Sequence, residues 1–274
     1  MKFLNGRKLA DKILKNLKRE IEEKQLKLKL AVVLVGENPA SEVFIRQKQN
    51  ACEKIGIDFQ LFKFPSKISR LELKKEIEKI VKDPINSGVI IQLPLPKGFN
   101  AQEILNLVSP EKDIDVLSEK NIGKFYTGNL AISPPTTKGI RRLLKEYKIS
   151  VKGKNVVLVG AGRLVGRPLA VWLLNEKTTV SIVDEFTKDI SYFTKRADII
   201  ISGVGKPNLI TGKMVKRGVA IIDVGIFFKR GKAVGDVELK TVSQKADYIT
   251  PTIGGVGPMI VACLLQNLVE LNTK

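Results

Sequence analysis

The chain has 274 residues, of which 43% are hydrophobic, and this suits a globular protein of one or two domains. It carries 47 Lys and Arg residues against 28 Asp and Glu, a formal net charge of +19, and it contains no histidine. The lack of histidine excludes Ser-His-Asp and Cys-His catalysis and histidine-ligated metal centres, and we expect no metal site. Proton transfer must therefore depend on lysine, tyrosine, carboxylates or water.

The sequence shows no signal for export or membrane insertion. No apolar run approaches the ~20 residues that a membrane-spanning helix needs, and residues 1–7 do not resemble a signal peptide. The two cysteines, Cys52 and Cys263, are too few for a disulfide framework, and their apolar, helix-like surroundings indicate buried thiols. We therefore expect a cytoplasmic protein with no membrane partner.

The positive charge raises the hypothesis of nucleic-acid binding, because nucleic-acid-binding proteins neutralise phosphates with basic groups. The lysines, however, are spread along every predicted helix and are rarely interleaved with aromatic residues. A basic, solvated surface is the better interpretation, and we expect no nucleic-acid partner. The summed field of such a surface would attract an anionic small molecule.

Hydrophobic periodicity predicts alternating helices and strands in the first part of the chain. It indicates a helix over 7–27, a buried strand over 30–35 and, with Ser41 as its cap, a helix that runs to about Lys54. A strand over 59–64, a helix over 71–81 and a strand over 89–92 are expected to follow. Alternation of this kind indicates a parallel sheet with helices on both faces.

The second part of the chain repeats this alternation after an irregular segment, 110–137, which we interpret as a domain junction. The elements predicted there are strands over 156–159, 180–183, 199–201 and 220–222, a helix over 168–174 and an apolar helix over about 258–271. We predict an α/β protein of two domains, one over 1–125 together with a C-terminal helix, 259–274, that packs back on it. The other, over 126–258, is expected to be a Rossmann-type dinucleotide-binding domain.

A glycine-rich loop directly follows the predicted strand 156–159 and opens a helix. Its glycines permit a tight turn and let backbone N–H groups approach a pyrophosphate at the helix N-terminus. The spacing is G-x-G-x-x-x-G rather than the usual G-x-G-x-x-G, so an ordinary tight turn is the alternative. The flanking strand and helix favour a dinucleotide site formed by Gly160, Ala161, Gly162 and Gly166.

Asp184 ends the next predicted strand, where a dinucleotide fold places the acid that binds the ribose hydroxyls. A carboxylate at this position accepts hydrogen bonds from the NAD ribose but repels the extra phosphate of NADP, and Glu185 adds a second negative charge. Solvated residues at the end of a strand are the alternative interpretation. We favour a cofactor role and a preference for NAD.

A second group of candidate residues lies in the first domain. Phe44 and Lys48 are four residues apart and share one face of a predicted helix. Gln92 ends a buried strand, where parallel sheets bind their ligands, and Asp115 lies in the irregular segment. Considered without other information, these residues are better explained by plain structural roles: a surface lysine, a strand-end amide and a loop acid.

Several short sequence blocks together identify a family. They are Pro39-Ala40-Ser41 followed by Lys48, Ala51-Cys52 and Gly56; Gln92-Leu93-Pro94-Leu95-Pro96; Asp223-Val224-Gly225-Ile226; Gly235-Asp236-Val237; Thr250-Pro251; and Gly254-Gly255-Val256-Gly257-Pro258-Met259. In content and order they resemble the signatures of the bifunctional methylenetetrahydrofolate dehydrogenase/methenyltetrahydrofolate cyclohydrolase family. The resemblance covers nearly the whole chain, and its last block is highly specific.

The resemblance implies roles for three residues of this second group. Lys48 would be the catalytic lysine, Gln92 its partner and Asp115 the acid that binds the pterin ring. The domain over 1–125 would then be the folate-binding catalytic domain. Its reactions would be oxidation of methylenetetrahydrofolate to methenyltetrahydrofolate and hydrolysis of that product to formyltetrahydrofolate.

The resemblance also implies binding roles for residues elsewhere in the chain. Gly255 and Pro258 would shape the folate cleft beside Phe44, and Ile226 would line the nicotinamide site together with Gly160 and Gly162. The anionic ligand would be polyglutamylated folate. NADP is the cofactor expected of the family, and a homodimer is its expected assembly.

Three departures from the family pattern leave alternatives open. Phe44 stands where the family has a tyrosine, the loop after Asp115 differs, and Asp184-Glu185 replaces a pair that usually begins with histidine. One alternative is a dehydrogenase with weak or absent cyclohydrolase activity. Another is a pseudoenzyme that binds folate or a dinucleotide, although the presence of Lys48 argues against it because a pure binder has less use for this amine.

Overall fold

The computed structural model describes residues 1–229 and 232–273, which form two compact units. The first unit comprises residues 11–135 and the described chain from 261 onward, and the second comprises residues 1–10 and 136–260. These limits differ from the expected domain boundaries, because residues 1–10 cluster with the second unit and residues 126–135 with the first. The functional division at 125/126 stays a prediction.

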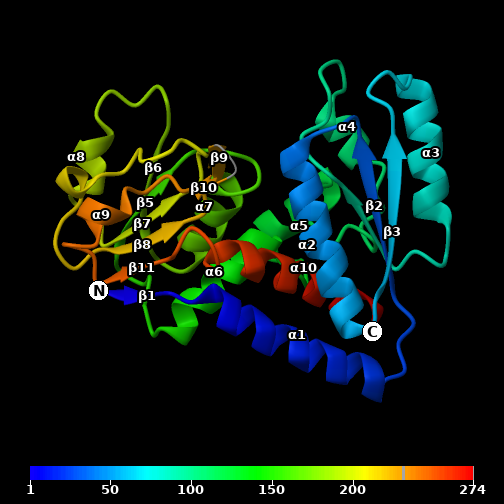
Figure 1. Cartoon of the computed structure of the whole chain (residues 1–274), viewed down its shortest axis with the longest axis horizontal. Coiled ribbons are helices and arrows are strands. Elements are labelled where there is room, and N and C mark those ends of the chain that lie inside the picture. Colours follow the sequence, from blue (N-terminus) through cyan, green and yellow to red (C-terminus); the bar gives the residue numbers. More distant parts are fainter. Residues whose placement is uncertain (230–231, 274) are drawn as a thin grey trace. The chain divides into compact units, whose positions relative to one another are not determined.

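The first unit is built on a parallel sheet in the order β3-β2-β4. Its strands are β2 (Lys29–Val35), β3 (Asp58–Phe64) and β4 (Gly88–Ile91), and its helices are α2 (Pro39–Ile55), α3 (Arg70–Lys82), α4 (Ala101–Leu105) and α5 (Glu119–Tyr126) (Figure 1). The central strand β2 is almost completely buried, as expected for a strand with neighbours on both edges and helices on both faces.

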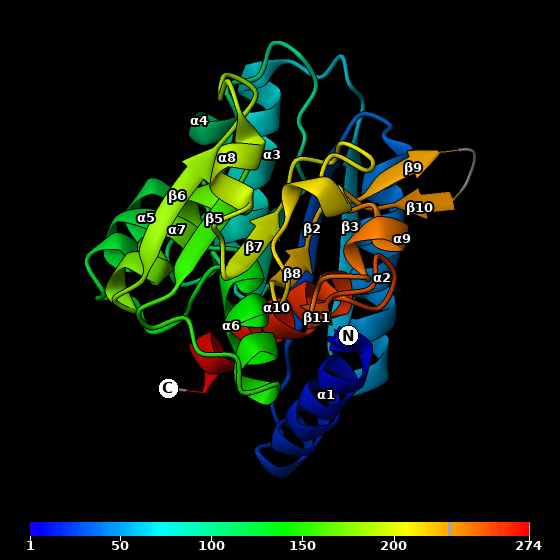
Figure 2. The same ribbon diagram turned by 90° about the vertical axis from the view of Figure 1, so that its left-hand side faces the viewer.

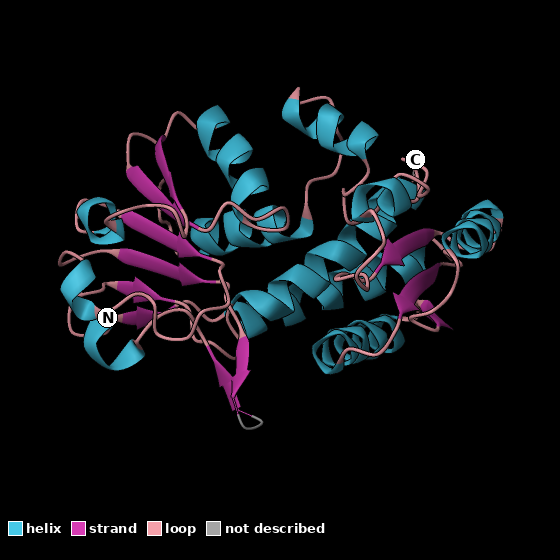
Figure 3. Cartoon of the chain, turned by 90° about the horizontal axis from the view of Figure 1, so that it is seen from above, coloured by secondary structure: helices cyan, strands magenta, loops and turns pink. Residues whose placement is uncertain are grey.

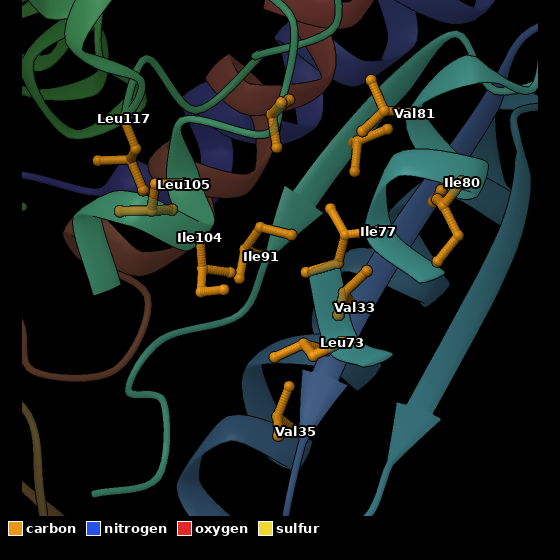
Figure 4. Packing of buried hydrophobic residues seen from close by; sticks show 13 residues of the cluster. Val33, Val35, Leu73, Ile77, Ile80, Val81, Ile91, Ile104, Leu105 and Leu117 are labelled. Atoms are coloured by element: carbon orange, nitrogen blue, oxygen red, sulfur yellow. The ribbon is translucent and has the colours of Figure 1, made fainter. Parts of the chain in front are cut away.

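Alternate residues of β2 point to opposite faces of this sheet, and one face carries a dense apolar cluster. Val33 and Val35 of β2 pack with Leu73 and Ile77 of α3 and with Ile91 of β4 (Figure 4). These side chains are all at most 3% exposed. Because Ile91 is the last residue of β4, the cluster holds the end of the strand that Gln92 directly follows.

The second unit contains a six-stranded parallel sheet in the order β1-β11-β8-β7-β5-β6, with β6 at one edge (Figure 2). Its strands are β1 (Lys2–Phe3), β5 (Asn155–Val159), β6 (Thr179–Val183), β7 (Ile199–Ser202), β8 (Ala220–Asp223) and β11 (Tyr248–Ile249), and β9 (Phe227–Lys229) and β10 (Lys232–Val234) form a separate hairpin. Its helices are α6 (Pro135–Glu146), α7 (Gly166–Asn175), α8 (Ile190–Thr194), the 3₁₀ turn η1 (Gly212–Met214) and α9 (Leu239–Val242). Helices lie on both faces of the sheet (Figure 3), and this confirms the Rossmann-type α/β fold.

Two long helices, α1 (Gly6–Glu23) and α10 (Val256–Asn272), each continue from one unit into the other. From Val261 onward α10 packs on the first unit. The side-chain amide of Asn267 donates to Ile114 O at 2.9 Å and to Ser133 O at 2.8 Å. Gly88 lies so close to α10 that an added Cβ would be 2.5 Å from Leu268 Cδ1. The predicted return of the C-terminal helix to the first domain is confirmed.

Two local predictions are wrong. Ser41 does not cap α2: the cap is Asn38, whose side chain accepts from Ser41 N at 3.0 Å, and Pro39 occupies the first turn, where its missing N–H is not needed. The segment 110–137 is not irregular throughout, because it contains α5, which begins after the cap Ser118.

Both cysteines are buried, as the sequence predicts. Among the residues that the structure describes, no helix is both long enough and apolar enough to cross a membrane.

Candidate active site

Lys48 lies in the middle of α2, and its amine reaches the end of β4. Its Nζ donates to Gln92 Oε1 at 2.7 Å, and both side chains are largely shielded from solvent. Helix α2 is held by its cap at Asn38 and ends at Gly56, which adopts the left-handed conformation (φ 79°) that ends many helices. The lysine is thus presented from the middle of a helix that is capped at both ends.

The orientation of the Gln92 side chain follows from its two partners. Its Nε2 donates to Leu93 O at 2.7 Å, and a backbone carbonyl can only accept. The amide oxygen must therefore face Lys48, where it accepts from the ammonium or amine. The backbone of Gln92 is fixed as well, because its N–H donates to Val33 O at 2.9 Å. The Lys48–Gln92 pair is therefore held in this geometry by the protein itself.

Asp115 lies close enough to Lys48 for the two charges to interact. Burial raises the pKa of Asp115 to about 6, although Lys48 opposes this increase. Burial also lowers the pKa of the Lys48 amine, and Asp115 and Cys52 partly counteract that decrease. Both shifts have the same main cause, since a charge is less stable when it is removed from water. At a given pH, the neutral form of the Lys48 amine is thus more populated than it is in a surface lysine.

A network of hydrogen bonds fixes the turn that carries Asp115. The carboxylate of Asp113 is buried and accepts from Leu117 N at 3.1 Å, from Ser118 N at 2.9 Å and from Ser118 Oγ at 2.6 Å. Asn121 donates to Pro110 O at 2.9 Å and so ties α5 to the start of the same turn. These residues were not predicted as part of the site, because a buried loop acid has no signature in a single sequence.

The three residues predicted to bind substrate lie in different places. Phe44 is half-buried on α2, one turn before Lys48. Gly255 and Pro258 belong to the second unit, at the start of α10. A side chain is not possible at Gly255, because its Cβ would lie 2.2 Å from Pro251 O. The role of these three residues in substrate binding stays a prediction.

The glycine loop of the second unit connects β5 to α7 and has different constraints at each glycine. Gly160 has a φ of +106°, which only glycine adopts readily, and its N–H donates to Val183 O at 2.8 Å. A Cβ on Gly166 would lie 2.0 Å from Gly160 O, so α7 begins in direct contact with the loop. Gly162, in contrast, has open space around it. Such space is what a closely approaching ligand needs.

Asp184 follows β6, the strand that runs beside β5, and therefore lies next to the glycine loop. Its Oδ1 accepts from Phe186 N at 3.1 Å and from Thr187 Oγ1 at 3.4 Å, so it stabilises its own turn. Within the described part of the chain its Oδ2 has no hydrogen-bond partner. Glu185 is exposed. The carboxylate thus has a structural role and can still accept from a ligand.

Ile226 follows β8 and is half-buried, and its carbonyl oxygen lies 3.8 Å from the position that a Cβ on Gly205 would occupy. The loops after β7 and β8 therefore meet at this point. Because ligands of doubly wound sheets bind at the carboxyl ends of the strands, this is the expected edge for a dinucleotide. No group of three or more His, Cys, Asp or Glu side chains among the described residues could hold a metal ion.

Comparison with known proteins assigns the two parts of the chain separately. Residues 4–115 match the model of the tetrahydrofolate dehydrogenase/cyclohydrolase catalytic domain. Residues 134–274 match the NAD(P)-binding domain of the same enzymes. The chain belongs to the tetrahydrofolate dehydrogenase/cyclohydrolase family. The resemblance inferred from the short sequence blocks is thereby confirmed.

Relatives of the family are similar over their whole length. A bifunctional FolD protein of Nautilia profundicola is 47% identical, with 98% of this chain and 96% of the relative covered. The crystal structure of the bifunctional FolD enzyme of Campylobacter jejuni is 41% identical, with a TM-score of 0.94 over 99% of this chain and 98% of that one. The Trypanosoma brucei FolD enzyme, complexed with NADP and an inhibitor, is 31% identical, with a TM-score of 0.94 over 98% and 96% of the two chains.

Proposed function

We propose that this chain oxidises methylenetetrahydrofolate to methenyltetrahydrofolate with a nicotinamide cofactor and hydrolyses that product to formyltetrahydrofolate. The hydrogen-bonded pair of Lys48 and Gln92 beside Asp115 carries this proposal. A lysine that is held in place and has a lowered pKa is suited to proton transfer. Membership of the tetrahydrofolate dehydrogenase/cyclohydrolase family supports the same conclusion.

In the hydrolytic step, water adds to the electron-poor methenyl carbon that bridges two nitrogens of the folate. Lys48 accepts a proton from the attacking water when its amine is neutral, and burial favours this form. Gln92 holds the amine through its carbonyl oxygen, and Asp115 accepts hydrogen bonds from the pterin ring. The hydroxyl of this adduct then loses its proton to solvent and becomes the formyl C=O, while the C–N bond to one folate nitrogen breaks. That nitrogen receives the proton held by Lys48, and the formyl group remains on the other nitrogen.

In the oxidative step, a hydride leaves the bridging methylene group, and the adjacent folate nitrogens stabilise the cation that forms. When bound, the nicotinamide ring supplies the hydride acceptor. The residues of this chain contribute position rather than proton transfer. The backbone of the loop from Gly160 to Gly166 is suited to cradle a pyrophosphate at the start of α7, since Gly162 leaves room for close approach. Loss of Lys48 should therefore affect oxidation less than hydrolysis.

We further propose that NAD is preferred over NADP. The free Oδ2 of Asp184 next to the glycine loop supports this preference, as does the nearby charge of Glu185. One like-charge contact with the extra phosphate of NADP costs about 1–4 kcal/mol, a roughly five- to several-hundredfold preference. Arg163 or Arg167 counteracts this effect if either reaches the phosphate. The Nη1 of Arg163 has no hydrogen-bond partner among the described residues, and the Nε of Arg167 donates to Ala161 O at 3.1 Å.

Steady-state kinetics of the dehydrogenase with each cofactor test this preference. We expect kcat/KM to favour NAD in the wild type, and Asp184→Ser to increase kcat/KM for NADP about tenfold or more. Asp189→Ser is the matched control, because it removes a negative charge from the same segment while serine still caps α8. A wild-type enzyme that favours NADP, or an equal gain in the control variant, would contradict the role of Asp184.

A second candidate function is a dehydrogenase with weak or absent cyclohydrolase activity. Phe44 favours this candidate because it lacks the hydroxyl of the family's tyrosine.

One assay separates this second candidate from the bifunctional enzyme. Purified protein is given methylenetetrahydrofolate and NAD⁺ or NADP⁺, while reduced cofactor and methenyl absorbance are followed. Reduced cofactor without accumulation of methenyl product supports the bifunctional enzyme, and accumulation supports the second candidate. If no reduced cofactor forms, the result favours a pseudoenzyme that binds folate or a dinucleotide. The predicted cytoplasmic location stays a prediction.

A further inference from the structure

Asp236 is completely buried at the carboxyl end of the six-stranded sheet in the second unit. Its Oδ2 accepts from Ser202 Oγ at 2.7 Å and from Val204 N at 2.8 Å, and its Oδ1 accepts from Lys206 N at 2.8 Å. A buried carboxylate is costly unless several donors satisfy it, and here three donors do so. All three come from the end of β7 and the loop that follows it, 203–206.

The loop 203–206 is in direct contact with the glycine loop. A Cβ on Gly160 would lie 3.1 Å from Val204 Cγ2, and a Cβ on Gly203 would lie 2.7 Å from Val165 Cγ1. On its other side the loop meets the carbonyl of Ile226. The backbone that Asp236 holds is therefore one wall of the candidate dinucleotide site, between the glycine loop and the segment after β8.

A second buried carboxylate holds Asp236 itself. Asp223, the last residue of β8, accepts from Asp236 N at 3.2 Å and from Gly225 N at 3.1 Å through Oδ1, and from Val237 N at 3.1 Å through Oδ2. The two carboxylates are packed so closely that a Cβ on Gly225 would lie 2.1 Å from Asp236 Oδ1. A Cβ on Gly235 would lie 2.0 Å from Asp223 Oδ2. The two acids thus form one tightly packed unit that leaves no room for side chains at these glycines.

We propose that Asp236 is a positioning residue for the dinucleotide: through its three hydrogen bonds it sets the place of the loop 203–206 against the glycine loop. This inference rests on the proposed function. It predicts that changing Asp236 affects cofactor binding but not ring opening. Ring opening needs no cofactor, and its candidate residues Lys48, Gln92 and Asp115 all lie in the first unit. The hydrolytic activity of the same chain is therefore an internal control.

The test is Asp236→Asn, which keeps the shape of the side chain but replaces one acceptor oxygen by an NH₂ group that faces N–H or O–H donors. We expect the dissociation constants for NAD⁺ and NADP⁺, measured by titration calorimetry, to increase roughly ten- to a hundredfold. The dehydrogenase KM for the cofactor should increase by a similar factor. The rate of methenyltetrahydrofolate hydrolysis should stay within about twofold of the wild type.

Two further variants make the test specific. Asp198 lies in the same unit but at the opposite, amino end of β7, where its carboxylate accepts from Asn155 N at 2.8 Å. The variant Asp198→Asn should therefore bind dinucleotide as the wild type does. Ser202→Ala removes one of the three donors to Asp236 and should weaken dinucleotide binding by a smaller factor, about three- to tenfold. Because it leaves the carboxylate in place, Ser202→Ala decides the question if Asp236→Asn does not fold.

The inference is wrong if Asp236→Asn binds both dinucleotides with wild-type affinity, or if it loses hydrolysis and cofactor binding in parallel. It is also wrong if Asp236→Asn does not fold and Ser202→Ala binds dinucleotide as the wild type does. The wild-type protein is measured first, since a wild type that binds neither dinucleotide and does not hydrolyse methenyltetrahydrofolate contradicts the proposed function itself. The two failures are thereby distinguished.

Discussion

Lys48 is the residue at which burial and chemistry are most closely linked. Its amine is removed from water and held by one neutral acceptor, Gln92, so its charged form is less stable than in a surface lysine. Asp115 opposes this effect but is itself easier to protonate, with a pKa raised to about 6. Such a cluster is costly for stability and useful for proton transfer, a combination found at functional sites.

Phe44, one helical turn from Lys48, provides a test by gain of function. Phe44→Tyr adds the hydroxyl that the family's tyrosine carries. A hydrogen bond to a charged or reacting group is worth about 1.5–3 kcal/mol, so we expect turnover to increase roughly ten- to a hundredfold, more in hydrolysis than in oxidation. Phe125→Tyr, which adds a hydroxyl to a half-buried ring on α5, is the control and should change neither rate. If Phe44→Tyr has no effect, the second candidate function gains support.

Among the elements, the turn from β5 into α7 contains two glycines that have different roles. Gly166 is required by the fold, because a Cβ there would lie 2.0 Å from Gly160 O. Gly162 is not required by the fold, since a Cβ there meets nothing within 4 Å. Its side-chain-free surface is therefore best explained by a ligand that approaches closely.

The matched pair Gly162→Ala and Gly166→Ala tests this distinction. We expect Gly166→Ala to lower the free energy of unfolding by about 1–3 kcal/mol, as overpacking does. Gly162→Ala should leave the free energy of unfolding within about 0.5 kcal/mol of the wild type but weaken dinucleotide binding about tenfold or more. Urea denaturation and cofactor titration measure the two quantities. Wild-type affinity in Gly162→Ala would show that no ligand approaches this residue.

The elements that the sequence predicts well are those with a strong local pattern. The strands β2, β5, β7 and β8 are short apolar runs that end at turn residues, and the structure confirms them. The helices α4 and α5 were missed, because five and eight residues are too few for a helical period to be recognised in the sequence. Each is also tied to a neighbouring segment by a side-chain amide. The Gln102 side chain of α4 donates to Leu117 O, and Asn121 of α5 donates to Pro110 O.

The candidate site could be predicted only where a motif marked it. Lys48 and Gln92 are 44 residues apart, and their contact depends on the parallel pairing of β2 with β4, which no local pattern reveals. Without the resemblance to a family they would have remained a surface lysine and a strand-end amide. The acids Asp113 and Asp236 were given no site role for a related reason: two of the three donors to each are backbone N–H groups, which leave no trace in the sequence.

At the scale of the whole molecule, the last helix joins parts of the sequence that are far apart. Asn267 of α10 bonds to the backbone at Ile114 and Ser133, 153 and 134 residues earlier in the chain. The first of these carbonyls immediately precedes Asp115. The chain's C-terminal end therefore supports the segment that carries a candidate site residue, although it is remote in sequence.

The assembly in solution is a separate question at this scale. We expect a homodimer, by analogy with the family and not from any residue of this chain. Light scattering at micromolar concentration measures the mass directly, and we expect twice the 30.3 kDa of the single chain. A monomer mass under these conditions would contradict the prediction without affecting the proposed reactions.

The central claim is that Lys48 transfers protons in ring opening, and one measurement tests it most directly: the rate of methenyltetrahydrofolate hydrolysis by Lys48→Met, followed by the loss of methenyl absorbance. Methionine keeps most of the side-chain length and removes the amine, so the fold should be intact and hydrolysis abolished, while dehydrogenase activity is reduced less. Lys54→Met, on the same helix but exposed and paired with Asp11, is the control and should hydrolyse as the wild type does. If Lys48→Met opens the ring at the wild-type rate, Lys48 is not the proton-transfer residue and the proposed mechanism is wrong.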